Sequence, residues 1–62
     1  MKVTIEGRDD SGRLSVSEGD NCVILESKGG KYDEQVRIFL SAVSTRVLIA
    51  SLTQAIEGDE DV

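Results

Sequence analysis

One stretch of helix length lies near the C-terminus of this chain, in residues 41–57, and every segment before it is shorter. At about 100° per residue, most of its larger apolar side chains fall within one arc of about 120°. These residues are Leu48, Ile49, Leu52, Ala55 and Ile56, with the polar Thr45 among them. The arc predicts an amphipathic helix that needs an apolar surface to lie on.

The segments before the helix alternate apolar and polar residues, which is typical of strands with one face on a core. The alternating segments are residues 1–7, 13–17, 22–27 and 32–40. Clusters of turn-forming residues at positions 7–12 and 18–21 separate the first three. We therefore predict an α+β fold, a four-stranded antiparallel β-meander packed on one C-terminal amphipathic helix in the order ββββα.

Two adjacent glycines at residues 29–30 are the clearest hairpin signal, because glycine adopts the positive φ angles of a two-residue primed turn without steric cost. A two-residue turn there places Val23 opposite Val36 and Leu25 opposite Glu34. The apolar side chains of both strands then share one face of the hairpin.

The helix carries expectations about its ends and its centre. Ser41 follows the last strand and can cap the helix, with Ser44 as the rival cap. Gly58 is expected to end it. Leu52 lies at the middle of the apolar arc, so we expect it to pack into the core. The strand residues expected beneath Leu52 are Val23, Leu25, Val36 and Ile38.

Sixty-two residues make one small domain, which we place at residues 1–58. A chain of this size buries only about 60% of the surface that its unfolded form exposes. Cys22 is the only cysteine and histidine is absent, so neither an internal disulfide nor the usual zinc site can add stability. Oligomerisation is the remaining common way to stabilise a domain of this size. The single cysteine, the lack of a signal-peptide pattern and the lack of a long apolar run predict a cytoplasmic protein that does not enter a membrane.

The net charge of −5 comes almost entirely from one end of the chain. Residues 1–56 are nearly neutral, whereas Glu57 and the acidic tail at 59–62 carry the excess. The acidic residues of that tail are Asp59, Glu60 and Asp61. The tail is interpreted either as a solvated end or as a segment that contacts a basic partner.

No residue pattern predicts catalysis, a metal or a cofactor. Cys22 has no histidine to activate it. Asp33 and Glu34 are neighbours on a predicted strand and point to opposite faces, which does not suit paired acid/base chemistry. The acidic clusters lack the spacing of a calcium loop. The seven basic residues are scattered among acids, with only two aromatic residues, so direct nucleic-acid binding is not expected either.

Two apolar groups are left unused by the predicted fold. The first is a helix stripe roughly opposite Leu52, made of Val43, Val47, Ala50 and Gln54. The second lies on the sheet face away from the helix and contains Cys22, Ile24 and Phe39. Two unused patches on a chain that cannot cross-link itself predict a homodimer. The helix stripe is the favoured contact because it permits a two-fold pair of helices.

The passage from the last strand into the helix also resembles a known group of proteins. The residues concerned are Leu40, Ser41, Arg46, Leu48, Leu52 and Ile56. Their pattern resembles small uncharacterised proteins of actinobacteria and their phages, over about the last third of the chain. It departs from that group in having Ser44 where an acidic residue is usual. The resemblance implies a phage or bacterial accessory protein, located in the host cytoplasm if phage-encoded, and no functional residue is carried over from it.

The leading hypothesis is therefore a non-enzymatic protein–protein interaction module that acts as a homodimer and can also bind a host protein. The alternative is an acidic inhibitor that mimics nucleic acid and binds a host nucleic-acid-binding enzyme through its carboxylates. Deletion of the acidic tail separates the two, because only the second depends on it and on low salt.

Overall fold

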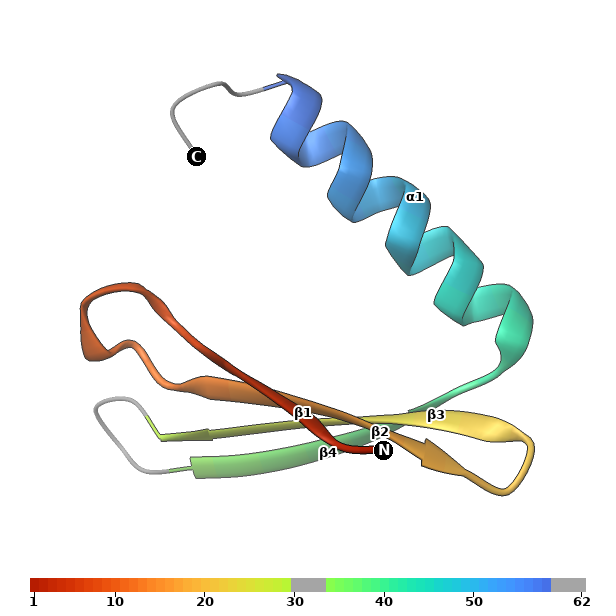
Figure 1. The fold of residues 1–62 in the computed structure, drawn as a ribbon, viewed down its shortest axis with the longest axis horizontal. Helices are drawn as coiled ribbons and strands as arrows, with labels where there is room; N and C mark the ends of the chain where they lie inside the picture. The colour runs from red at the N-terminus through yellow and green to blue at the C-terminus, as the bar shows by residue number, and fades with distance from the viewer. Residues whose placement is uncertain (30–33, 59–62) are drawn as a thin grey trace.

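A computed structural model describes residues 1–29 and 34–58, and it confirms the predicted α+β class (Figure 1). Four antiparallel strands follow one another in a meander of order β1-β2-β3-β4, and a C-terminal helix packs against them. A short 3-10 turn, η1 (Arg8–Asp10), connects the first two strands. The other elements are β1 (Val3–Glu6), β2 (Arg13–Gly19), β3 (Cys22–Gly29), β4 (Glu34–Leu40) and α1 (Ala42–Gly58).

The strand register collects the apolar residues on one side of the sheet. Val3, Val16, Leu25 and Ile38 form one apolar row across the four strands, and the two neighbouring rows are apolar except for Ser27 and Glu18. We call this side the apolar sheet face; its apolar residues are Val3, Ile5, Leu14, Val16, Val23, Leu25, Val36, Ile38 and Leu40. The opposite side, the polar sheet face, carries rows such as Thr4, Ser15, Glu26 and Arg37. Alternation in the sequence therefore predicts the two faces well.

The β3–β4 hairpin differs from the predicted two-residue turn. Gly29 pairs with Glu34 and Leu25 pairs with Ile38, so the connection comprises residues 30–33, which lie outside the described residues. The expected pairs of Val23 with Val36 and Leu25 with Glu34 are wrong. Gly29 still has a φ of 100°, which glycine adopts without strain, but it is the last residue of the strand and not part of a two-residue loop.

Side-chain pairing explains why the longer loop is preferred. The two registers differ by an even number of residues, so both keep the same side chains on each face. The observed register adds matched cross-strand neighbours, which stabilise a sheet by roughly 0.2 to 1 kcal/mol per pair. The matched pairs are Val23 with Leu40, Leu25 with Ile38 and Glu26 with Arg37. The preference of the two adjacent glycines for a two-residue turn does not outweigh these matched pairs.

The start of α1 is set by Ser41. The Ser44 amide donates to the Ser41 hydroxyl oxygen at 3.1 Å, and the Thr45 amide donates to the Ser41 carbonyl at 2.9 Å. Ser41 is therefore the cap and Ser44 lies in the first turn. At the other end, α1 runs through Gly58, which does not have a positive φ.

The helix lies over the apolar sheet face but contacts it only through its first half. Leu40 is half-buried beside the helix, whereas its neighbour Phe39, on the polar face, is 61% exposed. Within α1, Thr45 and Leu48 are half-buried, and Leu52 is 55% exposed. Figure 1 shows α1 rising away from the strands toward its C-terminal end. The predicted burial of Leu52 in the core is therefore wrong, although Leu52 does lie on the same side of the helix as Leu48.

The consequence is an open structure. None of the residues in the described ranges is buried, whether apolar, polar or charged. A short link through Ser41 holds the start of α1 against the sheet. Beyond this link the main contacts of α1 are with β3 and β4. The two apolar layers meet near Leu48 and then separate.

Candidate interaction surface

Exposed apolar side chains lie on both the sheet and the helix. On the sheet side Ile5 and Ile38 are each 51% exposed, and on the helix side Leu52 and Ile56 are 55% and 63% exposed. We call the apolar sheet face together with Leu48, Ile49, Leu52 and Ile56 of α1 the open apolar surface. Both parts are apolar and both are accessible, which is unusual for a monomeric protein that has no use for the surface.

The helix stripe predicted from the sequence is present and faces away from the sheet. Val43 and Val47 are 69% and 60% exposed, and Ala50 and Gln54 are exposed as well. Arg46 is the single charged residue of α1 before Glu57. The helix therefore has apolar residues on two opposite sides, which is typical of helices that are covered on both.

The second predicted patch is a group of neighbours on the polar sheet face. Ile24 pairs directly with Phe39 across β3 and β4, and Cys22 lies on the same side of β3 two residues earlier. Cys22 and Ile24 are half-buried because they pack against Gly19, where an added methyl group would lie 2.6 Å from the Cys22 sulfur. Phe39 is thus the exposed member of the group.

Charged side chains surround this second patch. Arg37 contacts Glu26 from β4, with Nη2 at 2.8 Å from Oε2, and Glu26 is the less exposed partner. The hydrogen bond from Arg37 lowers the pKa of Glu26 below its ordinary value, with a smaller contribution from Gln35. An ion pair across the centre of the polar face makes this side better suited to water than to a large apolar partner.

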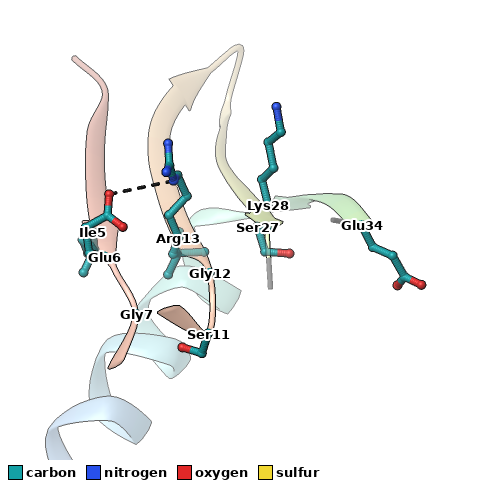
Figure 2. Close-up of a pocket in the computed structure, with 11 residues that line it drawn as sticks. Ile5, Glu6, Gly7, Ser11, Gly12, Arg13, Ser27, Lys28 and Glu34 are labelled. Atoms are coloured by element: carbon teal, nitrogen blue, oxygen red, sulfur yellow. Dashed lines mark ion pairs between the residues drawn. The ribbon is translucent and has the colours of Figure 1, made fainter. Parts of the chain in front are cut away.

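A hollow of about 310 Å³ lies at the end of the sheet away from the start of α1 (Figure 2). Figure 2 shows Glu6 and Arg13 facing each other from β1 and β2, with Oε1 and Nε 3.8 Å apart. Lys28 of β3 is paired with Arg13, and Ile5 contributes apolar surface. Charges of both signs mixed with apolar surface do not define one ligand chemistry. Within residues 1–29 and 34–58 no three possible metal ligands come together.

The acidic tail predicted as a partner-binding segment, with Asp59, Glu60 and Asp61, lies outside the described residues. No helix in the described part of the chain has both the length and the hydropathy to cross a membrane.

Together the fold and its exposed surfaces define a small meander sheet with one helix, both of which expose apolar side chains. Comparison with protein-family models found no match, and comparisons with curated proteins and with solved structures found no significant match. The case for a function therefore comes from the geometry of this chain.

The sequence interpretation missed the exposure of these side chains, because Leu52 was expected to pack on Val36, Ile38 and their neighbours on β3. The number of predicted elements, four strands and one helix, already indicated this exposure. Four strands make a sheet about 19 Å wide, at 4.8 Å per strand, which is roughly twice the width of one helix.

Proposed function

We propose that this protein is a non-enzymatic interaction module that acts as a homodimer. The observation that carries the proposal is the open apolar surface, because apolar side chains of both the sheet and the helix are exposed and none is buried. Exposed apolar surface is favourable to cover, at roughly 25 cal/mol per Å². A second protein surface is the simplest way to cover both parts at once.

The accessible area supports this proposal. A compact protein of 6.7 kDa is expected to expose about 3,900 Å². This chain exposes 5380 Å², which is roughly 1,500 Å² more. A stable interface of standard size takes about 800 Å² from each partner.

The resemblance of the strand-to-helix passage supports a role as a phage or bacterial accessory protein. In that role the dimer binds a host protein, and the open apolar surface or the helix stripe supplies the contact. The acidic inhibitor is the competing proposal, in which the tail replaces a nucleic acid on a basic partner. Removal of residues 59–62 distinguishes them, since loss of partner binding together with strong salt dependence favours the inhibitor.

Sedimentation equilibrium tests the homodimer directly. The parent protein is expected to be dimeric at about 100 μM, which is within the range of weak but specific interfaces. Val47→Glu places a charge in the helix stripe and should produce a folded monomer, because an unpaired charge is costly to bury.

The matched control is Thr53→Glu, which adds the same charge to the same helix about 120° around its axis from Val47. It should remain dimeric. A parent protein that is monomeric at about 100 μM would contradict the proposal. A dimer that survives Val47→Glu would move the contact away from the stripe, and Phe39→Glu would then test the second patch.

A further inference from the structure

The two edges of the sheet differ in how well they are protected against further pairing. In the order β1-β2-β3-β4 the edge strands are β1 and β4, and among the described residues each is paired on one side only. A very short edge strand is a poor template for another strand, and β1 has four residues. β4 has seven residues, all paired with β3 in one register without a bulge. It therefore presents the longer row of unpaired amide and carbonyl groups.

The side chains of β4 do not protect this edge either. Natural edge strands are often protected by charges that point outward. Between residues 35 and 40 the one charged residue is Arg37, and it is held against Glu26 of the neighbouring strand β3 at 2.8 Å. The apolar side chains of Val36, Ile38 and Phe39 are 49%, 51% and 61% exposed. A long, regular edge with exposed apolar side chains is suited to the addition of a strand.

We propose that β4 pairs with β4 of a second copy of this chain, antiparallel and about a two-fold axis perpendicular to the sheet. Two sheets of four strands would then form one continuous sheet. The inference rests on the homodimer proposed above and names the strand through which it forms. Such a contact is isologous, because the same edge of each copy supplies it.

The sequence of β4 is complementary to itself in this arrangement. With Ile38 on the axis, Ile38 lies opposite its own copy and Val36 lies opposite Leu40 on the apolar sheet face. On the polar sheet face Arg37 lies opposite Phe39, which places a cation beside an aromatic ring. Apolar pairs and cation–aromatic pairs both stabilise neighbouring strands. Moving the axis to Arg37 would oppose two arginines, and moving it to Phe39 would shorten the paired stretch.

The position of α1 makes a second copy a better occupant than a strand of an unrelated protein. The main contacts of α1 are with β3 and β4, so the helix lies over this pair of strands. At about 4.8 Å between strands, its axis is then about 5 Å from the two-fold axis, and the two copies of α1 are about 10 Å apart. Helices pack against each other at about 8 to 10 Å. Pairing of the edges thus also brings the helices into contact, which an unrelated strand would not do.

Disulfide formation tests the edge and its register. The native Cys22 is first replaced by Ser, and Ile38→Cys is then oxidised with oxidised glutathione. Opposite residues of antiparallel strands have Cα atoms about 4.5 to 5.5 Å apart, within the range of a disulfide. Ile38→Cys should therefore form a covalent dimer. Val36→Cys is the matched control, because Val36 and Ile38 are similarly exposed on the same strand and face. Two Val36→Cys residues would lie about 14 Å apart, at roughly 3.4 Å per residue.

A second control addresses the other edge. Ile5 of β1 lies on the same sheet face and is as exposed as Ile38, at 51%. Ile38→Cys should give several-fold more covalent dimer than either Ile5→Cys or Val36→Cys. Equal yields from Ile38→Cys and Ile5→Cys would show random collision and overturn the inference. A larger yield from Val36→Cys would overturn the register on which it depends.

The outcomes also separate this inference from the homodimer. A parent protein that sediments as a dimer, with no preferred product from Ile38→Cys, overturns the edge contact and leaves the homodimer standing. A parent protein that is monomeric at about 100 μM overturns both. As a second measurement, Phe39→Lys places a positive charge opposite Arg37 of the other copy and should raise the dimer dissociation constant about tenfold. Thr4→Lys, on the same sheet face at the other edge, should not, with circular dichroism showing that both variants remain folded. An unchanged constant in Phe39→Lys would contradict the pairing.

Discussion

Arg37 donates hydrogen bonds from Nε and Nη2 to one oxygen of Glu26, at 3.0 and 2.8 Å, and the two residues are direct partners across β3 and β4. The pair forms only in the register with the longer loop. In the predicted register Leu25 faces Glu34, an apolar side chain against a carboxylate. The ion pair and the apolar pairs on the other face therefore favour the same alignment of the hairpin.

The same pair predicts a pH dependence of stability. Arg37 lowers the pKa of Glu26 below its ordinary value of 4.5, so folding favours the ionised carboxylate. The stabilisation is complete above the pKa that Glu26 has in the unfolded chain. It is lost as the pH falls through the lower pKa of Glu26 in the folded state. Glu26→Gln should therefore lose less stability than the parent between about pH 6 and about pH 3, measured by thermal melts. Glu6→Gln, which removes the longer contact with Arg13, is the control and should behave like the parent.

Because α1 contacts the sheet only in part, replacing each of its two leucines should change the stability by a different amount. Leu48 is half-buried against the sheet, whereas Leu52 is 55% exposed. At concentrations where the protein is monomeric, Leu48→Ala should lower the free energy of unfolding by about 2 kcal/mol and Leu52→Ala by about 1 kcal/mol or less. Urea denaturation measures both. Equal costs of the two replacements would show a helix that is closed onto the sheet.

The connection between β1 and β2 predicts a sensitive glycine. The Gly7 amide donates to the Gly12 carbonyl at 2.7 Å, and a methyl group on Gly7 would clash with the Ser11 hydroxyl oxygen and lie 2.8 Å from that carbonyl oxygen. Gly7→Ala should therefore cost about 1 to 3 kcal/mol. Gly58→Ala is the matched control, because within the described part of the chain no side chain or distant backbone atom lies within 4 Å of its added methyl group. The control should be neutral or stabilising by up to about 1 kcal/mol. Comparable losses in the two variants would contradict the loop geometry.

The cap of α1 predicts a distinction between two serines. Ser41 accepts a hydrogen bond from the Ser44 amide at 3.1 Å, so Ser41→Ala should cost about 1 kcal/mol and Ser41→Asp should retain most of the stability. Ser44→Ala removes a side chain that bonds only the Ser41 hydroxyl among the described residues, and it should change stability by a few tenths of a kcal/mol. If Ser44→Ala is the more damaging change in urea melts, the helix begins one turn later than the structure places it.

Local patterns were enough to predict the elements and their faces. The alternation in Val3 and Ile5 and the helical spacing of Leu48 and Leu52 each depend on neighbours a few residues apart, so they can be read from the chain. Serine before the helix is a local signal too. The sequence interpretation therefore predicted the meander, the cap and the direction in which α1 presents its apolar side.

Tertiary structure decided two other features. The hairpin register depends on which pairs of distant side chains match, and a glycine pair is compatible with more than one loop length. The angle of α1 depends on how much of a sheet one helix can cover. Periodicity shows that Leu52 lies on an apolar side of α1 but not how closely that side approaches the sheet. By itself the sequence determined two apolar layers, whereas the relative widths of helix and sheet and the single tether at Ser41 decided that those layers stay apart in one copy.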